Sequence, residues 1–219
     1  MRFFKFKNSV NWKYALGEIA LLFIGINLAI WFNNWNSYKQ IEKSKNIAIT
    51  KIKEEILSNE IELKKSYQNI ISIKNALLDL KKLKKGKDNP EVFPQEMKAF
   101  QKKYSEIYKI SDSVKTKDEK YIYNGSTLIN LEIFELSSIA WETTKTINVL
   151  NEFGYECLYE LESGYNLQKR TLLEMDKVAN ALQKRDLYNL LSSLEFLEQY
   201  EEQLKEDYKN ILEKIEDCK

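Results

Sequence analysis

The chain has 219 residues and no histidine, and its 34 lysines and arginines almost balance its 33 aspartates and glutamates. The lack of histidine excludes histidine-based catalytic triads, the usual histidine general bases and most catalytic zinc sites. With only six glycines and two prolines, the composition favours helices over strands and turns, so we expect an all-α fold.

The charge of the chain is not evenly distributed. Residues 1–35 hold four cations and one acid, Glu18, which leaves 30 cations and 32 acids, a net charge of −2, for the remaining 184 residues. That balance excludes nucleic acid as a partner. The 184 residues are enough to bury the core of one domain.

Residues 14–35 form the most apolar stretch of the chain. Between Ile19 and Phe32 the only strongly polar side chain is Asn27. As a helix, this stretch would span about 33 Å, which matches a bilayer core of roughly 30 Å. We therefore predict a transmembrane helix over 14–35 after a basic cytoplasmic leader, 1–13. Aromatic side chains that favour the bilayer interface stand near both ends: Trp12, Tyr14, Trp31 and Trp35.

A basic leader before an apolar run is also typical of a secretory signal peptide. Cleavage requires small residues at the exit, where this chain has bulky aromatics such as Trp31 and Phe32. We expect an uncleaved anchor, because those side chains block the cleavage pattern. The leader cations favour a cytoplasmic N-terminus, although Lys39 follows the span closely. In a bacterium, the bulk of the chain would then be periplasmic and anchored in the inner membrane.

Four residues of the predicted span are candidates for contact with other membrane helices. Glu18, Gly25 and Ala29 share one helical face, and Gly25 with Ala29 forms a small-xxx-small pair that permits close helix approach. Asn27 lies about 200° around the helix from Gly25. The alternative for Glu18 is a hydrated acid at the interface, and a single Asn can also be incidental.

The same segment resembles a known protein family. The residues that carry the resemblance are Gly17-Glu18-Ile19, Ile24-Gly25-Ile26, Ala29-Ile30 and Asn33-Asn34-Trp35-Asn36. They are similar to the N-terminal signature of an uncharacterised family of small single-pass membrane proteins of the Bacteroidota. A looser pattern of the same family resembles residues 139–145, Ile-Ala-Trp-Glu-Thr-Thr-Lys. The resemblance implies one span and a helical remainder, and no activity.

Beyond the span, we expect a long helix over 36–85 with one buried seam. Its apolar residues recur every seven positions, as in a helix that packs along a partner. Asn59 and Ser66 interrupt the second row of the seam, which costs little at the rim of a bundle. The seam would pack within the chain or, alternatively, against a second copy in a parallel coiled coil. Its residues are Ile49, Ile56, Leu63, Ile70 and Leu77.

We predict a distal helical head over 91–184. A short helix starts at Pro94 and carries Tyr104 and Tyr108 on its inner side. A polar connection over 111–120 and a turn at Asn124-Gly125 lead to a second helix that runs to Leu150. After a break at 151–154, a third helix completes the head. A returning helix over 186–217 then packs antiparallel on the long helix through a second heptad seam: Leu190, Leu197, Leu204 and Ile211.

The two cysteines, Cys157 and Cys218, form neither a metal-ligand cluster nor a disulfide framework. A bridge between them is one alternative in an oxidising compartment, but we favour buried or idle thiols. Acidic residues alternate with lysines, which is typical of a solvated surface: Glu132, Glu135, Glu195, Glu198, Glu201 and Glu202. Tyrosines beside the apolar stripes are expected at the edge of the core, or alternatively on a binding surface: Tyr104, Tyr155, Tyr165 and Tyr208.

We expect no catalytic residue, no cofactor and no metal site. The expected function is that of a membrane-anchored interaction or scaffold protein, an accessory subunit of an envelope complex. The alternative is a transmembrane sensor whose head binds a ligand or protein. The expected partners are other membrane proteins and the lipid bilayer, and a homo-oligomer stays open.

Overall fold

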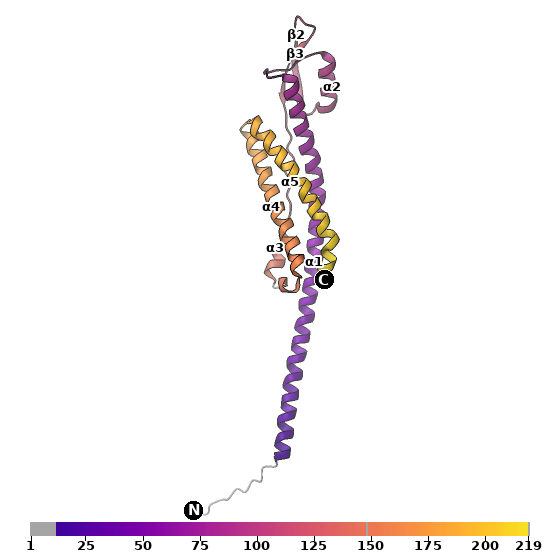
Figure 1. Cartoon of the computed structure of the whole chain (residues 1–219), viewed down its shortest axis with the longest axis vertical. Coiled ribbons are helices and arrows are strands. Elements are labelled where there is room, and N and C mark those ends of the chain that lie inside the picture. Colours follow the sequence, from indigo (N-terminus) through magenta and orange to yellow (C-terminus); the bar gives the residue numbers. More distant parts are fainter. Residues whose placement is uncertain (1–11, 148, 219) are drawn as a thin grey trace, which may run out of the picture. The chain divides into compact units, whose positions relative to one another are not determined.

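The structure is a computed structural model that describes residues 12–147 and 149–218. It is mostly helical with a small three-stranded sheet (Figure 1). The chain divides into two compact units, one that ends at Ile47 and one that comprises Ala48–Lys219. The elements are α1 (Trp12–Lys84), β1 (Glu91–Val92), α2 (Pro94–Tyr104), β2 (Tyr108–Lys115), β3 (Tyr121–Thr127), α3 (Ile139–Thr146), η1 (Leu150–Glu152), α4 (Tyr155–Gln183), α5 (Leu187–Lys214) and η2 (Ile215–Cys218).

Helix α1 contains both the apolar stretch and the first heptad seam. No glycine or proline occurs between Gly25 and Gly86, and α1 runs unbroken through this range, as predicted. It ends in three lysines, whose charges suit the negative end of a helix dipole. The basic leader lies outside the described residues except for Trp12 and Lys13.

The main core lies in the second unit. The ion pair Lys74–Glu198 joins α1 to α5 and the ion pair Lys53–Glu216 joins α1 to η2, so the C-terminal part of the chain runs in the opposite direction to α1. The two ion pairs give an antiparallel arrangement of these helices, and the chain's own helices cover the seam that a coiled-coil dimer would need. The two heptad seams are buried in a single apolar cluster: Ile49, Ile56, Leu63, Ile70, Leu77, Leu190, Leu197, Leu204 and Ile211.

Residues 108–127 contradict the all-α prediction, because they form an antiparallel hairpin. Strand β3 pairs with β2 on one side and with the short β1 on the other. Tyr108, predicted on a helix, begins β2, and the preceding helix α2 ends at Tyr104. A second, smaller core lies between the sheet, α2 and the end of α1: Ala76, Leu80, Val92, Met97, Phe100, Tyr104 and Tyr108. Helices α3 and α4 contribute to the main core instead.

Gly125 lies inside β3, not in the predicted turn at Asn124-Gly125. A Cβ at this position would come within 2.6 Å of the Lys109 carbonyl oxygen and 2.7 Å of the Tyr108 ring. The Tyr108 ring packs against the glycine, and its hydroxyl donates a hydrogen bond of 3.1 Å to the Tyr123 carbonyl. Glycine is required here for space rather than for a turn.

Residues 128–138 are extended, although helical spacing predicted a helix from 126 or 127 to Leu150. Among the described residues of 126–149, only Ile139–Thr146 is helical, as α3. Phe134 and Leu136 are buried while Glu135 between them is exposed, which is the alternation of an extended chain. Side chains of α1 and α4 bind the backbone of this segment, which compensates for the missing helical hydrogen bonds.

Local sequence explains where the other helices begin. Helix α2 starts at Pro94, and the Glu96 carboxylate accepts a hydrogen bond of 2.9 Å from the Phe93 amide. The predicted break at 151–154 is occupied by η1 and Gly154. Asp186 caps α5 by accepting from the Asn189 amide at 3.0 Å.

Candidate functional site

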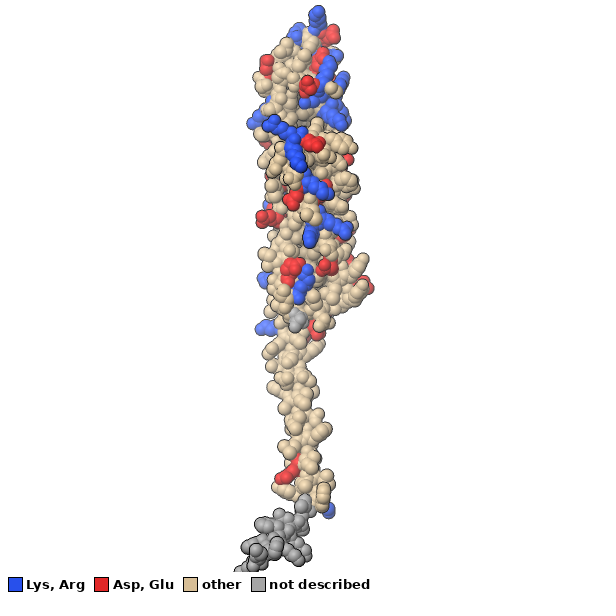
Figure 2. Space-filling model, turned by 90° about the vertical axis from the view of Figure 1, so that its left-hand side faces the viewer, with Lys and Arg blue, Asp and Glu red and all other residues tan. Residues whose placement is uncertain are grey.

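The first candidate site is the apolar surface of α1 before residue 36. Among the described residues, α1 is the one helix that is long and apolar enough to cross a membrane, by length and composition. Figure 2 draws this segment almost entirely without charge. Its large apolar side chains are exposed: Trp12, Leu16, Ile19, Leu21, Leu22, Phe23, Ile24, Ile26, Leu28, Ile30, Trp31, Phe32 and Trp35.

Aromatic side chains cluster where this surface ends. The rings of Trp31 and Trp35 stack with centroids 6.4 Å apart, and Phe32 lies 5.7 Å from Trp35. The ammonium of Lys39 lies 4.1 Å from the centre of the Trp35 ring. Aromatic rings beside a cation are the arrangement that favours the boundary between lipid and water.

The four predicted contact residues all lie on α1. Glu18 and Gly25 line one shallow hollow together with Leu21, Leu22 and Ile26. A Cβ added to Gly25 would meet nothing within 4 Å, so this face leaves room for another helix.

Ala29 follows Gly25 by one helical turn on the same face. Asn27 lies elsewhere on the helix, and its amide donates a hydrogen bond of 2.7 Å to the Phe23 carbonyl. That bond satisfies one of the two donors of the amide within the helix itself.

A buried polar centre in the second unit was not predicted from the sequence. The Glu55 carboxylate accepts hydrogen bonds from the Tyr165 hydroxyl at 2.7 Å, the Ser137 hydroxyl at 2.6 Å and the Ala140 amide at 2.9 Å. It also accepts from the Trp141 amide at 3.4 Å. Glu55 thus caps the start of α3, where the helix has no cap of its own.

Asn59, one of the two seam interruptions, extends this centre. Its side-chain amide binds the Ser137 backbone twice: it donates to the carbonyl at 2.7 Å and accepts from the amide at 2.8 Å. Gln168 donates to the Leu136 and Ser137 carbonyls, both at 3.0 Å, and accepts from Tyr208 at 2.7 Å. Asn59 is only 2% exposed, so the expectation of a bundle rim is wrong.

The centre immobilises residues 136–141, where the looser family pattern begins. The Trp141 ring stacks on Tyr165 at 5.6 Å, nearly parallel. Burial, and then the bond to Glu55, raises the pKa of Tyr165 far above its usual range, so its hydroxyl remains a donor. Because its donors are bound to acceptors, this centre holds residues 136–141 in one conformation.

A second buried acid, Glu201, contradicts the prediction of a solvated surface. Its side chain is fully buried, and Ser66, the other seam interruption, donates to it at 2.5 Å. Among the described residues, no partner reaches its second carboxylate oxygen. Burial raises the pKa of Glu201 to about 7, although the Ser66 bond opposes the shift.

The cysteines form a disulfide, which corrects the expectation of idle thiols. Cys157 at the start of α4 and Cys218 at the end of η2 have Cα atoms 5.7 Å apart and are bonded through their sulfurs. The bridge closes a sequence separation of 61 residues. It fastens the C-terminal turn to α4.

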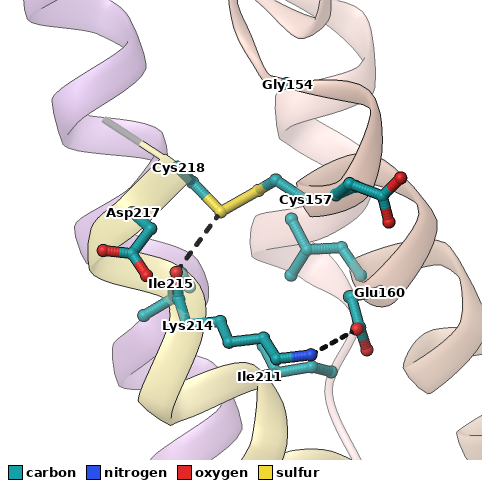
Figure 3. Close-up of a pocket in the computed structure, with 10 residues that line it drawn as sticks. Gly154, Cys157, Glu160, Ile211, Lys214, Ile215, Asp217 and Cys218 are labelled. Atoms are coloured by element: carbon teal, nitrogen blue, oxygen red, sulfur yellow. Dashed lines mark hydrogen bonds and ion pairs between the residues drawn. A yellow bond between two sulfur atoms is a disulfide. The ribbon is translucent and has the colours of Figure 1, made fainter.

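A cavity of about 380 Å³ lies beside this disulfide (Figure 3). The disulfide and the Lys214–Glu160 ion pair, at 2.6 Å, border it on different sides. Its volume is in the range of pockets for small ligands. Its inner lining is apolar: Leu161, Ile211 and Ile215.

The tyrosines divide between core and surface. Tyr104, Tyr165 and Tyr208 are buried, as expected for the core. Tyr155 is 77% exposed and stacks on Tyr159 with ring centroids 6.4 Å apart. Tyr159 also lines a polar groove of about 350 Å³ between α4 and α5, with Arg170 and Tyr200.

Over residues 12–147 and 149–218, no group of three acidic, cysteine or histidine side chains is placed to hold a metal ion. The chain matches no protein-family model, no curated protein and no solved structure. The resemblance of its N-terminal segment therefore remains an expectation.

Proposed function

We propose that this protein is a single-pass, membrane-anchored interaction or scaffold protein, an accessory subunit of a larger envelope complex. In this proposal, residues 14–35 cross the inner membrane with the N-terminus in the cytoplasm. The helical domain that follows lies in the periplasm. The mechanism is tethering: the span docks on neighbouring membrane helices, and the domain presents surfaces to other subunits.

The observation that carries the proposal is the exposure of the apolar side chains of α1 before residue 36. Contiguous apolar surfaces of this extent are rare on soluble monomers and mark membrane or protein contact. Here the apolar stretch is long enough to cross a bilayer and is bordered by stacked tryptophans.

The Cys157–Cys218 disulfide supports the periplasmic location. Disulfides form and persist in oxidising compartments and are rare in the cytosol of ordinary bacteria. The bridge belongs to the second unit, which is the part that the proposal places outside the membrane.

The proposed docking face is the hollow that contains Glu18 and Gly25. Without a hydrophobic driving force inside the bilayer, helices associate where small residues let their backbones approach. The open surface at Gly25 meets this requirement. An acid near the end of a span can also pair with a polar group of a neighbouring helix.

Affinity purification in mild detergent, with mass spectrometry of the co-purified proteins, tests the tether. The full chain is expected to retain membrane partners, and Gly25→Leu is expected to lose them because the larger side chain fills the hollow. Gly17→Leu is the matched control, since Gly17 also has open surroundings but does not line the hollow. Equal recovery from both variants would exclude this docking face.

The cavity beside the disulfide favours a second candidate, a ligand-responsive sensor. Gly154 lines the cavity and has no neighbour within 4 Å of an added Cβ, so Gly154→Trp is expected to fill part of it without disturbing the core. A tether would keep its partners in this variant. A sensor would lose its ligand-dependent response.

A further inference from the structure

Charge is strongly segregated within the part of the chain after residue 35. Residues 81–127 contain 12 lysines and 7 acids, a net charge of +5. Because residues 36–219 together carry −2, the other residues of that range carry −7. We call residues 81–127 the basic head. Figure 2 shows its lysines gathered at the top of the view.

Strand β2 is an open edge of the sheet in this head. The strand order is β1-β3-β2, so β2 pairs on one side only. Every residue of β2 after Tyr108 is exposed, including Ile110 and Val114. An exposed edge strand of this length presents a row of main-chain donors and acceptors that can pair with another chain.

The register shows which groups of β2 point outward. The Thr116 amide donates to the Lys120 carbonyl at 2.8 Å. Antiparallel pairs alternate, so Val114 also bonds toward β3, whereas the amides of Ser113 and Lys115 point away from it. The Asp112 carboxylate accepts from the outward Ser113 amide at 2.7 Å. A partner strand therefore has to displace this carboxylate before it can accept from the Ser113 amide.

Lysines outnumber acids along this edge, because residues 108–120 hold four lysines and three acids, Asp112, Asp118 and Glu119. Lys109 and Lys115 lie on β2, and Lys117 lies in the turn that follows; all three are exposed. Like charges on an edge oppose the pairing of two identical strands. The same lysines attract a strand of opposite charge.

We propose that β2 is a docking edge for an extended acidic segment of a partner protein, which adds a strand to the sheet. Main-chain hydrogen bonds supply affinity in this mode, and side chains supply specificity. The register places Ile110 and Lys115 on one face of the sheet and Lys109 and Val114 on the other, so the partner pairs an acid with a lysine of β2 and sets an apolar side chain against Ile110 or Val114 on each face. The inference goes beyond the proposed tether, and the two sites share no residue.

Fluorescence anisotropy with the full chain in mild detergent tests the docking edge. The probe is a labelled peptide, as long as β2, that alternates glutamate and valine. Ser113→Pro removes one outward amide and is tolerated at an edge strand; we expect at least roughly tenfold weaker binding, at an unchanged unfolding midpoint. The triple variant Lys109→Gln, Lys115→Gln, Lys117→Gln is expected to weaken binding similarly.

Two controls separate strand addition from general attraction to anions. The triple variant Lys169→Gln, Lys205→Gln, Lys209→Gln removes the same charge from exposed positions on α4 and α5 and is expected to bind as the parent does. The same peptide with alternate amides N-methylated keeps its charge but cannot pair, and is expected not to bind. If the methylated peptide bound as tightly as the unmethylated one, or if Ser113→Pro bound the peptide as tightly as the parent, the proposal would be overturned.

Discussion

The Tyr165 hydroxyl donates a hydrogen bond of 2.7 Å to the Glu55 carboxylate, across a sequence separation of 110 residues. This bond joins α4 to α1, and the same carboxylate binds the start of α3. A residue of the predicted heptad helix therefore holds α3 and α4 against α1, across separations of 85 and 110 residues.

Replacing Glu55 tests whether this centre specifies the fold. Glu55→Ala leaves several buried donors without an acceptor, and we expect a loss of about 3 kcal/mol in the free energy of unfolding. Urea unfolding of the full chain in mild detergent, followed by circular dichroism, measures it. Glu54→Gln is the control, because Glu54 lies on the exposed side of α1 in a surface ion pair with Lys51, and its change is expected to stay within about 0.5 kcal/mol.

Glu201 gives the domain a pH-dependent stability. Its folded pKa of about 7 exceeds its ordinary value of 4.5, so the folded state binds more protons between these values. The resulting stabilisation is fully present below about pH 4.5 and is lost as the pH rises through about 7. A shift of this size corresponds to roughly 3 kcal/mol.

Glu201→Gln is expected to remove this contribution to the pH dependence. The amide cannot ionise, so the variant should be more stable than the parent at pH 8, while the two converge near pH 4. Urea midpoints at both pH values measure the difference. Parallel pH profiles of parent and variant would show that Glu201 titrates normally.

Loss of the disulfide should weaken the attachment of the C-terminal turn. Cys157→Ser and Cys218→Ser are each expected to cost about 2–4 kcal/mol, because the unfolded chain gains the entropy of an open loop. The double variant is expected to match the single variants, and a reducing agent should lower the midpoint of the parent alone. Additive effects of the two substitutions would indicate that each cysteine acts through packing.

Gly125 is predicted to be irreplaceable in β3. Gly125→Ala forces a Cβ against the Lys109 carbonyl and the Tyr108 ring, and we expect a loss of about 1–3 kcal/mol, confined to the basic head. Hydrogen exchange of the β2 and β3 amides measures it locally. Gly154→Ala is the control, since an added Cβ there meets nothing within 4 Å.

Helical periodicity made much of this architecture predictable, whereas contacts between distant residues could not be predicted from the sequence. The seams of α1 and α5 were recognised because Ile49 and Leu204 belong to repeats that a helix places on one face. Strand β2 gave no such signal, since its residues after Tyr108 are exposed and show no apolar alternation. Gly125 suggested a turn because its actual constraint, the Tyr108 ring, comes from another strand.

The candidate sites also divide into features that local sequence predicts and features that depend on contacts between distant residues. The exposed apolar surface of α1 was predictable, because a continuous apolar run is a local property of the sequence. Glu201 lies beside Glu202, which is exposed, and only the fold shows which of the two acids is buried. The Cys157–Cys218 bridge likewise depends on α4 and η2 lying side by side, which no local pattern reports.

The central claim is that residues 14–35 remain attached and embedded in lipid as one crossing. Alkaline carbonate extraction of membranes, followed by intact mass measurement of the chain, tests it most directly. The account predicts that the protein stays in the membrane pellet with this segment still present. Release into the supernatant, or a mature chain that begins after residue 35, would contradict it.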